Sequence, residues 1–429
     1  MNLAERAWSL LSRAQEVYAD NPRASHWLRR HLARLGEPVR VVVAGQEGAG
    51  TSTLAAALAG EPGHSGHVGP SGHGRGAPPT WRHVRSVRTW PELLVLDAGL
   101  RPQDPPARVA ELIGEADAVL YLLGRNDSEP ALLRAVHDQA VPRLAPVNAI
   151  AVLARADELA GGRVDALTSA RQVARRWARQ APVAELCQDV VAVAGLLALA
   201  ARTLRGDEFE LLAALAAVPK AELDPLLLSA DRFGAEPQRA ELLARFGLFG
   251  IRLATTLLRN GTREPTALAA ELCRRSGFDA LGEAVSAYFT ARAPVLKARS
   301  ALLGLGVLLR REPRPPAAPL AAELERTLTG AHEFAELRLF SALRTGRVSL
   351  PGDLGEEAAR LVGGYGEAPQ ARLAVTAEET VSEPDLRQAA AGALRNWRAY
   401  AENPVLSSSE RLAAATVVRT CEGLVTGLL

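Results

Sequence analysis

The stretch GQEGAGTS, which begins at Gly45, has the residue types and spacing of a loop that binds the phosphates of a nucleotide. Such loops read G-x-x-x-x-G-K-[ST], and the stretch matches every fixed position except the lysine, where Thr51 stands. Gly45, Gly48 and Gly50 allow a tight turn whose backbone N–H groups face a bound anion. Ser52 stands where a hydroxyl binds Mg2+. The stretch therefore predicts a phosphate and magnesium site that lacks its usual cation.

Thr51 removes a charge that nucleotide enzymes use. The lysine at this position bridges the β- and γ-phosphates and offsets charge that builds in the transition state. Thr51 donates one hydrogen bond and has no charge, so its presence should cost on the order of a few kcal/mol in affinity. Lys220 and Lys297 are the only lysines among the 50 Lys and Arg residues. A general bias of composition would therefore replace a lysine of this chain with arginine, and it does not explain a threonine. Arginines that could replace the lysine follow the loop: Arg75, Arg82, Arg85 and Arg88.

Apolar stretches on both sides of the loop predict the elements that hold it. VRVVVAG, which ends at Gly45, is typical of a buried strand, and STLAAALAG is typical of a helix. Thr53, in the first turn of that helix, completes the loop residues that we expect to contact nucleotide. The stretches ELLVLDAG, ADAVLYLLG, NAIAVLARAD and DVVAVAG predict four more buried strands. Continuous apolar strands with crossover helices indicate a mainly parallel sheet with helices on both faces.

Helical patterns occupy both ends of the chain. Leu, Ala, Arg and Glu recur at helical spacing from about residue 200 to the end, and the first residues show the same spacing as one helix that continues after Pro22. The expected fold class is an α/β P-loop GTPase-like domain plus a long all-α helical bundle or stalk region. We expect an N-terminal helical segment at 1–37, the P-loop GTPase-like domain at 38–205 and the helical region at 206–429.

Asp97 ends the second predicted buried strand, in the sequence LLVLDAGL. An aspartate at this place holds Mg2+ through water in GTPases, so Asp97 and Ser52 are the predicted magnesium residues. GTPases read D-x-x-G here, and the N–H group of that glycine meets the γ-phosphate. This chain has Leu100 in the fourth position and Gly99 one place early, which weakens the contact to the γ-phosphate. The alternative is an acidic residue that only caps a buried strand.

Arg155 and Asp157 match part of the guanine-binding pattern [NT]-K-x-D at the end of a later strand. Asp157 has the carboxylate that accepts hydrogen bonds from the N1 and N2 edge of guanine. Arg155 keeps an aliphatic stem that covers the base, in line with the preference of this chain for arginine over lysine. Ala154 has lost the polar group of the pattern, so ATP in place of GTP stays open. The alternative is an exposed aspartate in an ordinary loop.

With these elements in this order, the chain resembles the bacterial dynamin-like GTPases, in particular the isoniazid-inducible type. The resemblance is clearest at ADAVLYLL, at VNAIAVLARADELAGGRVDALTSARQVARRW and at CQDVVAVAGLLA, and it extends more weakly over about residues 1–425. Members carry AGKST at the loop, where this chain has AGTST, and a switch threonine, for which Thr80 is the candidate here. The phosphate end of the site therefore departs from the family at several points, while the guanine end is partly kept.

The resemblance implies a helical stalk and dimerisation controlled by GTP with Mg2+. It implies that the segment 1–37 packs on the C-terminal helices. It also implies a homodimer, or a heteromer with a competent dynamin-like paralogue, in the cytoplasm with peripheral contact at the inner face of the cell membrane. A net charge of +2 gives no bulk attraction to nucleic acid, so no nucleic-acid partner is expected.

Three functions remain open on the sequence alone. The first is a pseudo-GTPase or weak GTP binder that acts as a structural or interaction partner in a membrane-associated assembly, and Thr51 with Leu100 favours it. The second is an active GTPase in which an arginine replaces the lysine. The third is a helical scaffold that binds no nucleotide. Cys187, Cys273 and Cys421 lie far apart, so neither a disulfide framework nor a CxxC zinc pattern is predicted, and a reducing compartment fits.

A histidine group stands in the glycine-rich segment after the phosphate loop. His64, His67 and His73 follow the spacing H-x2-H-x5-H, which could bind zinc or nickel. Glu61 is the only carboxylate near them, and no cysteine accompanies them. We therefore expect a solvated loop here rather than a metal site.

Overall fold

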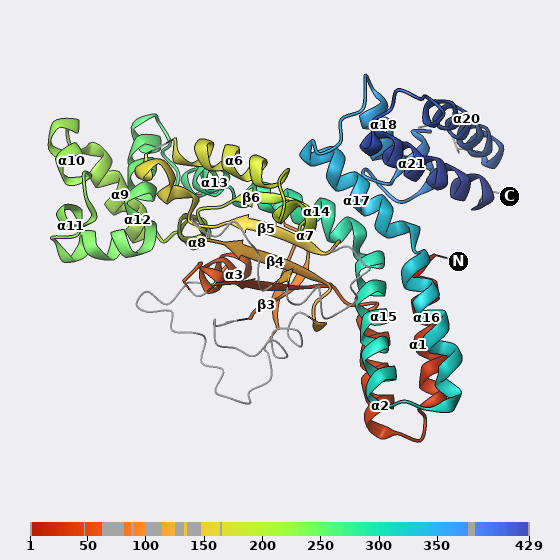
Figure 1. Cartoon of the computed structure of the whole chain (residues 1–429). Coiled ribbons are helices and arrows are strands. Elements are labelled where there is room, and N and C mark those ends of the chain that lie inside the picture. The colour runs from red at the N-terminus through yellow and green to blue at the C-terminus, as the bar shows by residue number, and fades with distance from the viewer. Residues whose placement is uncertain are drawn as a thin grey trace. The chain divides into compact units, whose positions relative to one another are not determined.

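The structure is a computed structural model of the whole chain (Figure 1). It describes residues 2–46, 48–61, 81–86, 90–98, 114–124, 133–134, 147–163, 165–375 and 382–427. The chain forms two units. The α/β unit comprises Glu37–Pro142 and Asn148–Thr290, and the helical unit comprises Met1–Gly36, Arg143–Val147 and Ala291–Leu429.

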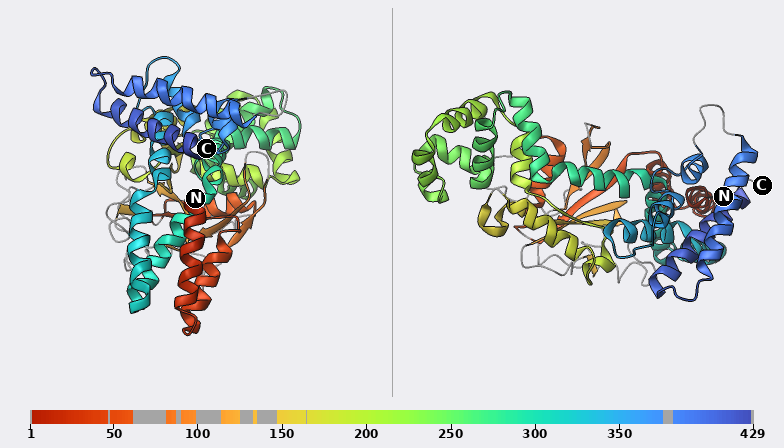
Figure 2. Two further views of the ribbon diagram at one scale, coloured as in Figure 1. Left: turned by 90° about the vertical axis from the view of Figure 1, so that its right-hand side faces the viewer. Right: turned by 90° about the horizontal axis from the view of Figure 1, so that it is seen from above.

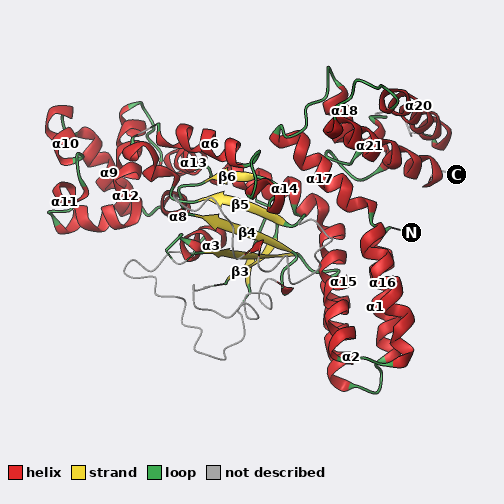
Figure 3. Cartoon of the chain, in the orientation of Figure 1, coloured by secondary structure: helices red, strands yellow, loops and turns green. Residues whose placement is uncertain are grey.

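The α/β unit is built on a six-stranded sheet in the order β2-β3-β1-β4-β5-β6. The strands are β1 (Val39–Gly45), β2 (Arg82–Val84), β3 (Leu93–Asp97), β4 (Ala118–Leu123), β5 (Ala149–Leu153) and β6 (Val190–Ala192). All neighbouring pairs are parallel except β2 with β3. The predicted fold class, a mainly parallel α/β domain joined to a long helical region, is confirmed (Figure 3).

Burial of the central strands explains why their sequences are apolar throughout. Every residue of β1, β4 and β5 is buried, so both faces of the sheet are covered, as a parallel sheet requires. The five predicted strands are present. β2 was not predicted, because its sequence is the three residues RHV at a sheet edge and has too little apolar pattern to indicate a strand.

The helices of the α/β unit follow the strands and then continue to Thr290. They are α3 (Thr51–Ala59), η1 (Ala156–Gly162), α6 (Ala166–Trp177), α7 (Val183–Leu186), α8 (Gly195–Arg202), α9 (Gly206–Ala217), α10 (Lys220–Leu226), α11 (Ala230–Phe233), α12 (Pro237–Arg259), α13 (Pro265–Ser276) and α14 (Phe278–Tyr288). α3 packs against α8 and against β1 and β3, and α6 packs against β6.

The segment 206–290 shares the apolar core of the α/β unit. Phe249 and Leu253 of α12 belong to the same buried cluster as Tyr121 of β4 and Leu153 of β5. The sequence analysis placed a boundary after residue 205 and grouped this segment with the C-terminal helices. In the structure, the division between the two units falls after Thr290 instead. The periodicity of these helices does not distinguish a helix that covers a sheet from one that belongs to a bundle.

The helical unit joins the two ends of the chain. Its longer helices are α1 (Leu3–Val17), α2 (Pro22–Arg34), α15 (Ala293–Arg311), α16 (Ala318–Gly330), α17 (His332–Thr345), α18 (Leu354–Leu361), α19 (Pro369–Leu373), α20 (Glu383–Ala401) and α21 (Ser408–Gly427). Short 3-10 turns η2 (Thr290–Arg292) and η3 (Pro315–Ala317) precede α15 and α16. α1, α2, α15 and α16 lie side by side (Figures 1 and 2). Among the described residues, no helix is long and apolar enough to cross a membrane.

Contacts within the helical unit hold the N-terminal helices against α15 and its neighbours. The Tyr18 hydroxyl donates to the Glu312 carbonyl oxygen at 2.5 Å, and Arg13 pairs with Glu323 at 2.7 Å. The single helix that was expected across Pro22 is two helices, because Asn21 caps the start of α2 with its side chain. α15 contains the apolar sequence SALLGLGVLL, most of which is buried, so the helix is part of a core.

Candidate nucleotide site

The phosphate loop joins the carboxyl end of β1 to α3, at the point where the strand order reverses. β1 lies between β3 and β4, and such a reversal opens the crevice in which α/β sheets bind ligands. Gly48 and Gly50 have φ of 78° and 95°, which favour glycine. A Cβ atom at either position would meet no described atom within 4 Å. The left-handed backbone at Gly48 and Gly50 is of the kind that a tight glycine turn requires.

The first turn of α3 follows Gly50 directly. Gly50 stands at the N-cap position and has no side chain that could cap the helix. The N–H groups at Thr51, Ser52 and Thr53 and the positive end of the helix dipole are therefore left for a ligand. The three side chains are partly exposed. The methyl group of Thr53 lies 3.9 Å from where a Cβ on Gly195 would stand, so this side of Thr53 faces the start of α8. The turn can bind an anion but adds no cation to it.

Gly45 also meets a packing requirement of the sheet. A Cβ atom on Gly45 would lie 2.8 Å from the Leu122 carbonyl oxygen and 2.9 Å from the Leu122 Cβ. β1 and β4 could not approach this closely with any larger residue. The sequence analysis placed Gly45 among the nucleotide-binding residues, and the structure adds a packing requirement that any protein with this sheet would have.

Asp97 lies next to the phosphate loop because β3 pairs with β1. Its register partner is Val43, two residues before Gly45, and the Ala98 N–H donates to the Val43 carbonyl oxygen at 3.1 Å. Asp97 is half-buried. Asp97 therefore ends the strand beside β1, and Ser52 lies in the first turn of the helix that follows β1. Their carboxylate and hydroxyl oxygens are of the kind that Mg2+ prefers. Thr80, Gly99 and Leu100 lie outside the described residues.

Arg155 joins the loop after β5 to the phosphate loop. Its Nη2 donates to the Gly48 carbonyl oxygen at 2.9 Å, and its Nη1 pairs with Glu158 at 3.2 Å. The Arg155 backbone has φ of 50°, in the left-handed region, which directs this side chain as the chain enters η1. The sequence pattern predicted a stem that covers a base. The structure adds a contact that brings the two halves of the candidate site together.

Asp157 lies in the first turn of η1 and is half-buried. Burial raises the pKa of its carboxyl group above the usual value, and Glu158 raises it further, while a backbone hydrogen bond and Arg155 lower it. Ala154 is buried, and the Ala156 N–H donates at 3.3 Å to the carbonyl oxygen of Val193, the residue that follows β6, so the loop is held at the end of that strand. Asp157 is thus a partly desolvated carboxylate beside Arg155 rather than an ordinary surface residue.

The structure describes two of the four arginines that were proposed as substitutes for the lysine. Arg82 pairs with Glu61 at 2.8 Å, and Arg85 is exposed. Arg75 and Arg88 lie outside the described residues, as do the metal candidates His64, His67 and His73. His83 pairs with Glu92 at 2.7 Å. The part of the chain that the structure describes contains no group of three or more side chains suited to hold a metal ion.

Comparison with known proteins supports the resemblance seen in the sequence. The chain is 34% identical over 325 residues to the isoniazid-induced protein IniC of Mycobacterium tuberculosis, in strains CDC 1551 / Oshkosh and ATCC 25618 / H37Rv. The match covers 74% of this chain and 65% of those relatives, so the chain spans a little less than two thirds of their length.

Two further comparisons add less. A solved structure of LeoA, a bacterial dynamin GTPase from ETEC, is 12% identical, with a TM-score of 0.27 over 99% of this chain and 93% of that one. No model of a protein family matches the chain. The chain is therefore a relative of the isoniazid-induced protein IniC, in line with the resemblance to the isoniazid-inducible type of bacterial dynamin-like proteins.

Proposed function

We propose that this chain is a pseudo-GTPase, or a weak GTP binder, that acts as a structural or interaction partner in a membrane-associated assembly. The observation that carries the proposal is Thr51 at the first position of α3, where the helix start has no side-chain cap and a threonine stands in the place of the lysine. A nucleotide held there would keep its backbone contacts and lose the ammonium that stabilises the transferred phosphoryl group.

Weak binding, rather than none, is supported by the loop after β5. The hydrogen bond from Arg155 to the Gly48 carbonyl oxygen fixes that loop against the phosphate loop. Asp157 lies two residues further on, with a carboxylate that can accept from the guanine edge. The backbone of the base-side loop is therefore set before a ligand arrives, which reduces the ordering entropy that binding must overcome.

Slow or absent hydrolysis is supported by the partners that Arg155 and Arg82 already have. Arg155 is engaged by Gly48 and Glu158, and Arg82 is engaged by Glu61. A guanidinium that substitutes for the lysine would first have to leave these partners. This argument disfavours the alternative of an active GTPase with an arginine in the place of the lysine.

Magnesium fits the same site. Ser52 and Asp97 would hold Mg2+ when GTP is bound, and the ion would supply positive charge to the phosphates. Without the lysine, that ion and the amide groups of the loop would have to supply the charge that the ammonium supplies in other phosphate loops. The role as an interaction partner rests on the family, and its expected forms are a homodimer or a heteromer with a competent dynamin-like paralogue.

Equilibrium binding and turnover of GTP by the purified chain, with Mg2+, test the proposal. We expect the natural chain to bind GTP weakly and the Ser52→Ala and Asp97→Ala variants not to bind it. The natural chain should hydrolyse GTP no faster than these two variants do. Turnover at a rate typical of GTPases, abolished by both substitutions, would establish the active enzyme instead. No binding of GTP or ATP by a folded chain would establish the nucleotide-free scaffold.

A further inference from the structure

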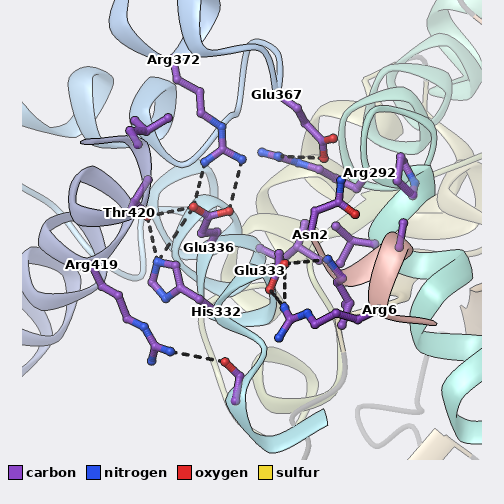
Figure 4. Close-up of a pocket in the computed structure, with 18 residues that line it drawn as sticks. Asn2, Arg6, Arg292, His332, Glu333, Glu336, Glu367, Arg372, Arg419 and Thr420 are labelled. Carbon is purple, nitrogen blue, oxygen red and sulfur yellow. Dashed lines mark hydrogen bonds and ion pairs between the residues drawn. The ribbon is translucent and has the colours of Figure 1, made fainter. Parts of the chain in front are cut away.

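The helical unit contains a cavity of about 560 Å3 that the nucleotide site does not use. The starts of α1, α15 and α17 line it, together with α19, α21 and the segment between α18 and α19 (Figure 4). A volume of this size suits a small molecule. Its walls are as polar as they are apolar, and the polar part consists largely of charged side chains.

Positive charge exceeds negative charge around this cavity. Among the described residues, its lining includes three glutamates and four arginines: Arg6, Arg292, Arg372 and Arg419. Arg6 pairs with Glu333 at 3.2 Å, and Arg372 binds both oxygens of Glu336, at 2.8 and 3.3 Å. Arg292 and Glu367 are 3.7 Å apart. Arg419 donates to the Gly330 carbonyl oxygen at 3.3 Å and has no carboxylate partner in the part of the chain that the structure describes.

Three helices begin at the cavity, and two of them, α15 and α17, add the positive end of an uncapped helix dipole. Asn2 and Glu5 cap α1, and Glu333 of α17 accepts from the Leu3 N–H at 3.1 Å. No side chain caps α15 or α17. The potential inside the cavity is therefore more positive than the side-chain charges alone imply, and an anion is the ligand that this potential favours.

Two of the guanidinium groups meet over one glycine. A Cβ atom on Gly363, which has φ of 81°, would lie 2.7 Å from Nη1 of Arg292 and 3.1 Å from Nη2 of Arg372. Figure 4 shows the two groups turned toward each other. Glycine at this position is what lets both cations approach, although they repel each other. A negative charge between them would offset that repulsion.

Arg292 also has a donor that nothing described satisfies. The residue is 2% exposed, and its Nε is buried without a hydrogen-bond acceptor among the described residues. The Nε groups of Arg6 and Arg372, in the same cavity wall, are in the same state. Buried donors without partners are uncommon and indicate a bound water, ion or ligand.

We propose that this cavity binds the phosphate group of a small phosphorylated ligand, through Arg292, Arg372 and Arg419. A phosphomonoester is a tetrahedral anion with a charge near −2 and three acceptor oxygens, so it can accept from guanidinium groups that arrive from different directions. Glu367 is exposed and only loosely paired with Arg292, so the phosphate displaces it. The remaining volume holds the organic part of the ligand.

Variants of exposed residues test this proposal without disturbing the fold. The full-length chain is titrated by calorimetry with inorganic phosphate and with glycerol 3-phosphate, and it is tested for binding to phosphatidylcholine vesicles that contain phosphatidic acid. Arg419→Gln should weaken binding about tenfold, which corresponds to one charge-assisted hydrogen bond. Glu367→Gln should tighten it about two- to fivefold by removing a competing carboxylate. Arg395→Gln, an exposed arginine of α20 that does not line the cavity, is the matched control and should change nothing.

The two soluble probes and the vesicles distinguish the source of the phosphate. Binding of glycerol 3-phosphate that responds to both substitutions identifies a soluble ligand, and vesicle binding that responds in the same way identifies a lipid headgroup. Saturable binding of no probe, or binding that Arg419→Gln and Glu367→Gln leave unchanged, overturns the proposal. The affinity for GTP should be the same in Arg419→Gln as in the natural chain. The proposal for this cavity and the proposal for the nucleotide site can therefore be refuted independently of each other.

Discussion

Thr51→Lys should restore tight GTP binding if the missing lysine is what weakens the site. The substitution is made at the first position of α3, directly after Gly50, whose φ of 95° keeps the loop open. Thr51 is partly exposed, and a Cβ added at Gly50 or Gly48 would meet no described atom within 4 Å. The longer side chain therefore has room to turn back over the loop toward the phosphates.

The expected gain follows from one charge-assisted contact to phosphate. Hydrogen bonds to charged groups contribute about 1.5–3 kcal/mol, and each 1.4 kcal/mol is a factor of ten in affinity. We therefore expect GTP to bind about 10- to 150-fold more tightly to Thr51→Lys than to the natural chain. The lower half of this range applies if the ammonium stays largely hydrated.

Calorimetric titration of GTP with Mg2+ measures the effect, and Thr51→Met is the matched control. Methionine is long and apolar like the lysine stem, but it has no charge, so it should leave the affinity close to that of the natural chain. A Ser52→Ala substitution added to Thr51→Lys should remove most of the gain if Mg2+ takes part. An equal gain with Thr51→Met, or tight binding by the natural chain, would refute the reasoning from the missing charge.

Three further predictions concern Arg155, Asp157 and His332. Arg155→Ala should weaken GTP binding about fivefold, because the phosphate loop loses its contact at Gly48. The affinity for GTP is measured by titration of the Thr51→Lys protein with and without Arg155→Ala. Burial raises the pKa of Asp157, so its carboxylate is protonated at a higher pH than that of an ordinary aspartate. As the pH is lowered, the affinity for GTP should therefore begin to fall at a higher pH, and Asp157→Asn should make the affinity less dependent on pH. Burial lowers the pKa of His332 below its ordinary 6.5, despite the opposing effects of Glu336 and Glu333, so the unfolded chain binds the proton first. The unfolding temperature of the helical unit, measured by calorimetry, should therefore fall as pH drops through 6.5, and His332→Gln should reduce the slope.

The sheet could be predicted because its central strands are buried on both faces. Continuous apolar sequence is required there, so composition alone marks β1, β4 and β5. β2 carries no such mark, because an edge strand of three residues needs only one buried side chain, at Val84. The sequence also could not show that α9 to α13 pack in the α/β unit. Phe249 and its neighbours need an apolar surface to pack on, but their helical spacing does not distinguish the sheet from the other helices.

The candidate site shows the same division between local and long-range information. The loop glycines and Ser52 could be identified because a phosphate loop is one continuous stretch. The contact between Arg155 and Gly48 spans 107 positions in sequence, and no local pattern encodes it. The cavity in the helical unit was not found from the sequence for the same reason: its arginines come from positions as far apart as Arg6 and Arg419, and their spacing matches no motif.

The loop after β5 carries costs that a purely structural loop would avoid. A left-handed backbone at a residue other than glycine, as at Arg155, costs roughly 1–2 kcal/mol. The raised pKa of Asp157 means that the folded state holds its proton more tightly than the unfolded chain does, so stability falls as pH rises through this range. At neutral pH, where the carboxylate is charged, that loss is complete. Packing of β5 requires neither feature, because glycine at 155 and asparagine at 157 would fit the same turn. Costs of this kind cluster at binding sites, so they support a base-side loop shaped to receive a nucleotide, even though Thr51 leaves the phosphate side without its cation.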